Sequence, residues 1–178
     1  MAYEFYIAIS GTKSTFKGES SRTKYADQME GFYYESAIGS PRDPLTGQAS
    51  GRRRHTPVLI RKKIGASTPL IAKALCTNEV LKSVVFSFVR TAPDGSEKTF
   101  FKVTLTNATV ASAKLLVPDS SLTEARQEFY EEVSFTFQKI EWNHIEAQTM
   151  AIDDWNASEE AEAAAPAGGD KKQAAAKK

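Results

Sequence analysis

The strongest constraint on the fold is that the chain holds one convincing internal helical segment, set between two strand-like runs. Residues 69–77 place apolar side chains at helical spacing, with Thr68 directly before them and Pro69 at the first helical position. A threonine hydroxyl can accept a hydrogen bond from an amide of the first turn, and a proline there gives up no donor that the helix needs. Asn78 tolerates the left-handed conformation that ends a helix. Because so short a helix is marginal alone, a sheet must hold it.

Strand patterns account for the rest of the ordered chain. Apolar and polar side chains alternate, as in strands with one packed face, over residues 3–10, 58–64, 82–107 as a hairpin, and 129–142. Residues 32–38 are an aromatic run that favours a strand, and 108–117 continue as strand. The phase of the alternation changes near Asn107 and at Gln138, where bulges are expected. The neighbouring carboxylates of Glu131 and Glu132 must then point to opposite faces. We expect 129–142 to be the last strand.

These patterns predict a mainly β protein, classed as α+β by some schemes. The strands have more hydrophobic faces than one short α-helix at about 69–77 can cover, so these faces are buried either by closing the sheet on itself or by a partner. The folded domain is expected to span residues 1–156. Residues 157–178 contain no large apolar side chain, so we predict a disordered C-terminal tail.

Composition and charge exclude several classes of function. A formal charge of +1 gives no overall field directed at nucleic acid or a membrane surface. The first residues lack the pattern of a secretory signal peptide, and no apolar run has the length of a membrane span. We therefore expect the chain to be made and folded in the cytosol, without membrane insertion.

Catalytic and metal-binding motifs are missing from the sequence. It contains no phosphate-binding loop, nucleophile elbow or zinc-protease motif, and Cys76, His55 and His144 lack the spacing of a zinc site. We predict no catalytic, cofactor or metal site and no enzyme activity. Cys76 is expected to be a small buried packing residue. The alternative, a cysteine hydrolase with His144 as its base, finds no support in the local sequence.

A second alternative is a monomeric β-barrel binding module for a small ligand or single-stranded nucleic acid. Phe100, Phe101 and Lys102 interleave aromatic and basic side chains, which can stack nucleotides on a sheet. Half-buried strands show the same pattern, so this segment does not distinguish a nucleotide-binding surface from an ordinary half-buried strand.

The segment 39–55 is a long loop rich in proline and glycine. Loops of more than about 12 to 15 residues without secondary structure are usually functional or disordered. Arg52, Arg53, Arg54 and His55 close this loop. Three consecutive arginines can grip phosphate or a carboxylate-rich partner surface, although a solvated charge run gives the same pattern.

Four motifs in register identify a resemblance. The run T-P-L-I-A-K-A-L-C-T at 68–77 and the strand E-V-S-F-T-F-Q-K-I-E-W at 132–142 resemble those of the haemolysin-coregulated protein (Hcp) family, the tube proteins of type VI secretion. The sequence F-K-G-E-S at 16–20 is similar to the family's early turn, and D-D-W at 153–155 to its short ending. The similarity runs in order over residues 3–155.

This resemblance implies a small β-barrel of two antiparallel sheets with one short flanking α-helix at about 69–77, as the domain of residues 1–156, and a structural role. It implies hexameric rings that stack into a tube inside a contractile sheath, contact a spike protein at the tip and carry effectors in the lumen. It also implies a protein that begins in the cytoplasm and is secreted through the apparatus without a signal peptide. In the family the long loop lies toward the next ring, so Arg52, Arg53, Arg54 and His55 are expected to contribute to stacking.

Surplus hydrophobic strand faces suggest where the subunits meet. A ring needs the same two patches on every subunit, and each patch is buried by the next copy. The candidates are outward-facing residues of the first strand and of 129–142, namely Tyr6, Phe129, Ile140 and Trp142.

Overall fold

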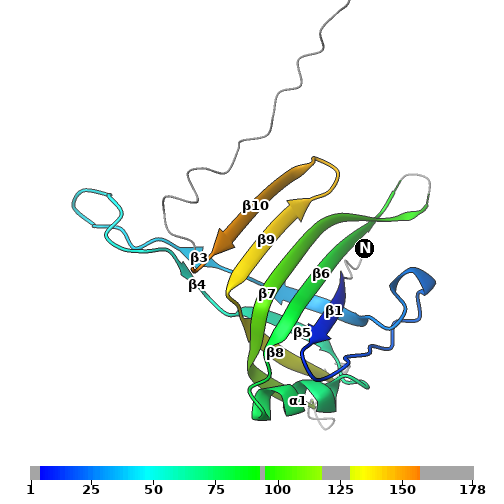
Figure 1. Cartoon of the computed structure of the whole chain (residues 1–178). Coiled ribbons are helices and arrows are strands. Elements are labelled where there is room, and N and C mark those ends of the chain that lie inside the picture. The colour runs from blue at the N-terminus through cyan, green and yellow to red at the C-terminus, as the bar shows by residue number, and fades with distance from the viewer. Residues whose placement is uncertain (1–4, 93–94, 118–128, 157–178) are drawn as a thin grey trace, which may run out of the picture.

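Figure 1 shows a computed structural model of the chain, in which residues 5–92, 95–117 and 129–156 are described. The elements in chain order are β1 (Phe5–Gly11), η1 (Thr23–Tyr25), β2 (Met29–Glu35), β3 (Ile38–Gly39), β4 (Arg54–His55), β5 (Val58–Lys63), α1 (Thr68–Cys76), β6 (Leu81–Thr91), β7 (Glu97–Leu116), β8 (Tyr130–Thr136), β9 (Lys139–His144) and β10 (Thr149–Asp154). Within this described part, no helix has the length and apolar character needed to cross a membrane.

Six antiparallel strands close into a barrel. The main sheet runs in the order β10-β9-β7-β6-β1-β2-β5-β8, and β8 pairs again with β7, which closes the ring of strands. The long strand β7 makes this possible, because residues 101–106 pair with β9 and residues 109–116 pair with β8. The β9–β10 hairpin therefore extends beside the barrel (Figure 1). The predicted mainly β barrel with one short helix is confirmed.

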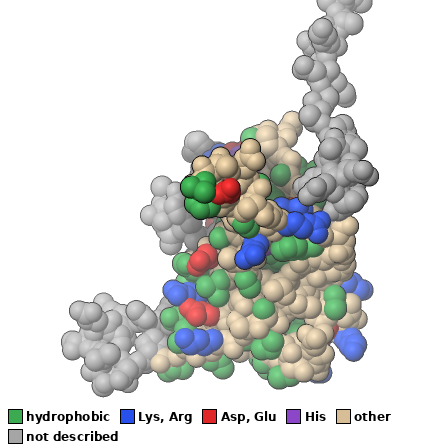
Figure 2. Space-filling view, turned by 90° about the vertical axis from the view of Figure 1, so that its left-hand side faces the viewer, with side chains coloured by type: hydrophobic (Ala, Val, Ile, Leu, Met, Phe, Trp, Pro, Cys, Tyr) green, Lys and Arg blue, Asp and Glu red, His purple; other side chains and the backbone are tan. Residues whose placement is uncertain are grey.

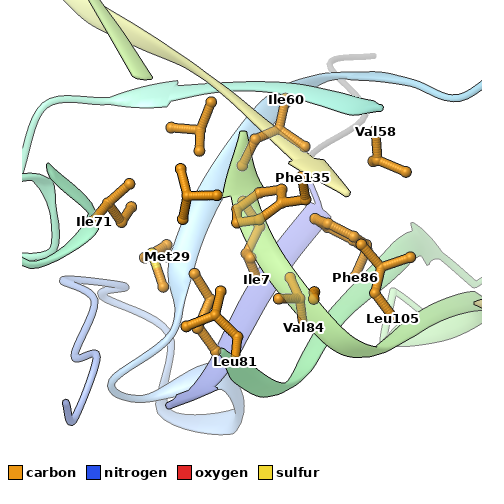
Figure 3. Close-up of a cluster of buried hydrophobic side chains, with 14 of the residues drawn as sticks. Ile7, Met29, Val58, Ile60, Ile71, Leu81, Val84, Phe86, Leu105 and Phe135 are labelled. Carbon is orange, nitrogen blue, oxygen red and sulfur yellow. The ribbon is translucent and has the colours of Figure 1, made fainter. Parts of the chain in front are cut away.

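The barrel interior is the hydrophobic core. Inward side chains from every barrel strand meet there, as the alternation of each strand requires (Figure 3). Phe86 and Phe135 lie at its centre with ring centroids 6.3 Å apart. Ile71 and Ala74 of α1 are buried in the same cluster, so the helix covers one end of the barrel (Figure 1).

A buried ion pair fixes the helix to the barrel. The side chains of Lys62 on β5 and Glu131 on β8 are both 2% exposed and form a salt bridge. The Thr68 hydroxyl donates to Glu131 Oε1 at 3.0 Å, at the first residue of α1. Removing either charge would leave the other buried without a partner, which is costly. The expectation that Glu131 and Glu132 face opposite ways is confirmed, because Glu132 pairs with Arg61 on the outer wall.

Local geometry confirms the predicted phase changes. Asn107 has a positive φ of 49°, and the buried positions shift there from Val103 and Leu105 to Ala108 and Val110. The second change is not the expected bulge within one strand 129–142, because residues 137–138 divide this run into β8 and β9. Asn78 also has a positive φ, of 52°, as expected after a helix.

Two predictions about order and burial are wrong. Residues 129–142 are not the last strand, because β10 follows and pairs with β9 along its whole length. Cys76 is exposed and not a buried packing residue. At about 100° per residue, position 76 lies well off the stripe of Ile71 and Ala74. The segment between the strands predicted at 108–117 and 129–142 and the predicted tail at 157–178 lie outside the described residues.

Candidate functional site

A projecting loop is the most distinctive feature of the surface. The short strands β3 and β4 pair at its base, and the chain between them extends far from the barrel (Figure 1). Its tip is an ordered turn in which Asp43 accepts a hydrogen bond from the Leu45 amide at 2.9 Å, and this bond lowers the pKa of the Asp43 carboxyl. The Leu45 side chain at this tip is 94% exposed.

The base of the loop is anchored to β10. Asp153 accepts hydrogen bonds from Arg53 Nε at 2.6 Å and from His55 Nε2 at 2.5 Å, and a second Arg53 nitrogen completes the ion pair. The Arg53 hydrogen bond is the largest of the causes that hold the pKa of Asp153 below its usual value. The Arg53 guanidinium also donates to the Asp154 carbonyl at 3.3 Å. The loop therefore leaves the barrel in a fixed direction.

Aromatic rings pack around this anchor. The His55 side chain is 4% exposed and stacks on Trp142 with centroids 6.1 Å apart. Phe137 and Trp155 approach His55 edge-on at 5.3 and 5.4 Å. A groove of about 530 Å³ lies beside them, lined by His55, Thr56, Pro57, Asn107, Thr109, Thr136, Phe137, Gln138, Trp155 and Asn156.

Two further apolar surfaces are exposed on different sides of the fold. The first, called the edge surface, consists of Ile145, Met150 and Ile152 on the β9–β10 hairpin. The second, called the wall surface, consists of Phe32, Tyr33, Leu115, Val117 and Phe129 around Tyr130. Arg61 lies over the Tyr33 ring at 4.6 Å and the Tyr130 ring at 5.6 Å, which makes the wall surface amphipathic.

The predicted loop residues separate into two groups. Arg53 and His55 meet at Asp153, whereas Arg52 and Arg54 are exposed. Figure 2 looks onto the side from which the loop projects and shows Lys and Arg side chains gathered beside it. The anchoring role of Arg53 and His55 was not foreseen, since sequence reasoning placed all four residues in contact with a partner.

The predicted interface residues also separate. Tyr6 and Ile140 are 0% exposed, so their side chains cannot contact another subunit on the surface. Tyr6 stacks on Tyr25 at a centroid distance of 3.9 Å, because the segment between β1 and β2 covers the outer face of β1. Trp142 is half-buried against His55. Phe129, 60% exposed in the wall surface, stays a candidate.

Asp153 is the functional residue that sequence reasoning missed. Its only signal was the D-D-W run at 153–155, which was assigned to the end of the ordered chain. In the structure this run carries the acceptor of the anchor and Trp155, which lines the groove. No cluster of three or more potential metal ligands occurs in residues 5–92, 95–117 and 129–156.

Comparison with known proteins assigns the family. The sequence model described as "Type VI secretion system effector, Hcp" matches residues 6–144. This chain belongs to the Hcp family. Hcp proteins are structural tube proteins of type VI secretion and not enzymes, so the projecting loop and the apolar surfaces belong to a structural, exported component.

Individual relatives agree with this assignment. This chain is 32% identical over 168 residues to the "Major exported protein" of Pseudomonas aeruginosa. The aligned region covers 87% of this chain and 96% of the relative. A crystal structure of an Hcp protein superposes with a TM-score of 0.81 at 26% identity, covering 88% of this chain and 100% of the other. A variant of Hcp1 from E. coli EAEC 042 superposes with a TM-score of 0.77 at 26% identity, covering 86% of this chain and 99% of the other.

Proposed function

We propose that six copies of this Hcp protein form a closed ring, and that the rings stack into the inner tube of a type VI secretion apparatus. The observation that carries the proposal is that one subunit exposes two different apolar surfaces, the edge surface and the wall surface. A cyclic ring buries one patch of each subunit against a different patch of the next subunit, so both patches of every subunit are buried when the ring closes.

The edge surface is suited to one side of the ring contact. Among the described strands, β10 pairs only with β9, so its outer edge carries unpaired backbone donors and acceptors. Met150 on this strand is 61% exposed and Ile152 is 42% exposed. Exposed edge strands with apolar side chains associate with other chains unless they are covered, and the neighbouring subunit is the proposed cover.

The projecting loop is the proposed contact between rings. The anchor at Asp153 fixes its direction, and the tip presents Leu45 to the next ring. Arg52 and Arg54, exposed at its base, supply positive charge to the same contact.

The remaining parts of the proposal come from the family. A tube of this kind lies inside a contractile sheath, meets a spike protein at its tip and carries effector proteins in its lumen. The protein starts in the cytoplasm and leaves through the apparatus. Within the chain, residues 1–156 are the proposed tube domain, and residues 157–178 a separate tail.

Charged substitutions on the edge surface test the ring. Met150→Glu combined with Ile152→Glu places two like charges in the proposed interface, so light scattering should report a shift from ring to monomer. Val80→Glu is the matched control, because Val80 is also an exposed apolar residue, 44% exposed, but lies beside α1. If the double variant keeps the mass of the wild type, the edge surface is not the ring contact.

A further inference from the structure

Two arginines at the base of the projecting loop face solvent. Side chains alternate along extended backbone, so Arg53 and His55 turn together toward Asp153. Arg52 and Arg54 are directed away from that carboxylate and are exposed. None of the ion pairs formed between described residues includes either of them. Two adjacent guanidinium groups are thus available to an acidic partner.

The chain leaves the sheet next to these arginines. After β10, the Trp155 amide donates to the Gln138 carbonyl at 3.0 Å, and the Asn156 amide donates to Asp154 Oδ1 at 2.8 Å. Trp155 and Asn156 line the same groove as His55, which directly follows Arg54. The last described residue therefore lies close to the base of the loop.

The sequence that follows is acidic. Glu159, Glu160 and Glu162 occur within six positions of Asn156, whereas the first lysines after them are Lys171 and Lys172. An extended chain spans at most about 3.3 to 3.6 Å per residue, so these carboxylates have a reach of roughly 10 to 20 Å from Asn156. This distance includes the arginines beside the groove.

We propose that the acidic segment 159–162, which lies outside the described residues, binds Arg52 and Arg54 and covers the basic base of the loop. Guanidinium groups bind carboxylates with paired, charge-assisted hydrogen bonds. Exposed ion pairs are individually weak, but the short tether keeps the carboxylates at a high effective concentration. The contact is consequently sensitive to salt, which screens exposed charges beyond about 10 Å at 0.1 M.

The consequence for assembly rests on the proposed function. If Arg52 and Arg54 take part in stacking, the acidic segment competes with the next ring for them and limits the growth of the tube. A nucleic acid is a less suitable partner for this surface, because binding along a nucleic-acid backbone needs many basic groups and the whole chain carries a formal charge of only +1.

Arginine modification in the full-length protein tests the contact directly. Phenylglyoxal modifies accessible guanidinium groups, and mass spectrometry gives the rate at each arginine. We expect Arg52 and Arg54 to react at least roughly threefold faster in the triple variant Glu159→Gln, Glu160→Gln and Glu162→Gln than in the wild type, a change in the range of weak surface ion pairs. Salt at about 0.5 M should raise the wild-type rate similarly.

Controls separate this contact from general effects. Arg42 is exposed in the same loop and should react equally in both proteins. The double variant Lys171→Gln and Lys172→Gln changes the charge of the same tail. In this variant the modification rates of Arg52 and Arg54 should equal those of the wild type. Equal rates at Arg52 and Arg54 in the wild type and the triple variant would overturn the proposal.

The modification rates are compared at a protein concentration at which light scattering finds no stacked rings, so that stacking does not shield Arg52 and Arg54. A protein that forms no rings at any concentration refutes the proposed function and leaves the contact itself testable. Tube length in electron micrographs is the readout for competition, and the triple variant should form longer tubes. Shorter or unchanged tubes, with faster modification, would overturn the competitive role.

Discussion

His55 and Asp153, separated by 98 positions in the chain, are joined by a hydrogen bond of 2.5 Å between Nε2 and Oδ2. Arg53 binds the same carboxylate, so one acidic side chain on β10 holds both the residue before β4 and the last residue of β4. This contact holds the base of the loop against β10. The composition of the loop, rich in proline and glycine, does not by itself indicate such an anchor.

Replacing Asp153 by Asn should loosen the loop. The substitution removes the charge that binds Arg53 and His55, and the expected loss of stability is about 2 kcal/mol, as for hydrogen bonds to a charged group. Urea unfolding measures the loss, and hydrogen exchange at the β3 and β4 amides should show faster opening. Arg52→Gln, at the exposed neighbouring position, should change stability by less than about 0.5 kcal/mol. Equal effects of the two substitutions would contradict the anchor.

The buried ion pair predicts a non-additive effect. Lys62→Met leaves the Glu131 carboxylate buried without its cation and should cost about 3 to 5 kcal/mol in urea unfolding. The double variant Lys62→Met, Glu131→Leu removes both charges and should recover most of that loss. If the double variant is as unstable as the sum of the two single variants, the pair is not coupled as described.

Glu79 predicts a pH dependence of stability. Its carboxylate accepts hydrogen bonds from the Lys13 amide at 2.7 Å and from the Ser14 amide and hydroxyl, and these lower the pKa of Glu79 from 4.5 to about 2. A depressed pKa stabilises the folded state above pH 4.5, and this contribution is lost as the pH falls toward 2.

The Glu79→Gln variant isolates this contribution. Its stability should be lower than that of the wild type at pH 6, and the difference should shrink as the pH falls from 4.5 to about 2. Urea midpoints measured over this range give the difference. A difference that stays constant with pH would show that the charge of Glu79 has no part in holding the segment after β1.

Replacing Leu45 should weaken ring stacking without lowering the stability of the subunit. Because its side chain is 94% exposed, Leu45→Ser should leave the free energy of unfolding within about 0.5 kcal/mol of the wild type. Stacking should nevertheless weaken, since the substitution removes the apolar group at the tip. Electron micrographs should show intact rings and fewer tubes. Normal tubes would exclude Leu45 from the contact between rings.

The sequence was sufficient for elements with a strong local signal. Period-two alternation located the hairpin of β6 and β7, and the phase change at Asn107 appears in the structure as a residue with positive φ. Thr68, Pro69 and Asn78 located the helix to within one residue at each end. In each case neighbouring residues determine the local geometry.

Features that depend on distant partners were not predictable. The residues of β10 show no alternation of burial, because Met150 and Ile152 are exposed along with their neighbours, and only pairing with β9 defines the strand. Tyr6 looked like a surface residue because its cover comes from Tyr25 in a polar segment. Asp153 and Arg53 lie 100 positions apart, and nothing in either local sequence indicates that they meet.

The most direct test of the tube proposal is the solution mass of the purified full-length protein, measured by light scattering after size exclusion together with negative-stain images. The subunit has a mass of 19.5 kDa. We expect a particle with six times this mass and the shape of a ring. A strict monomer across the micromolar range would contradict it, because the edge and wall surfaces would then remain exposed in solution.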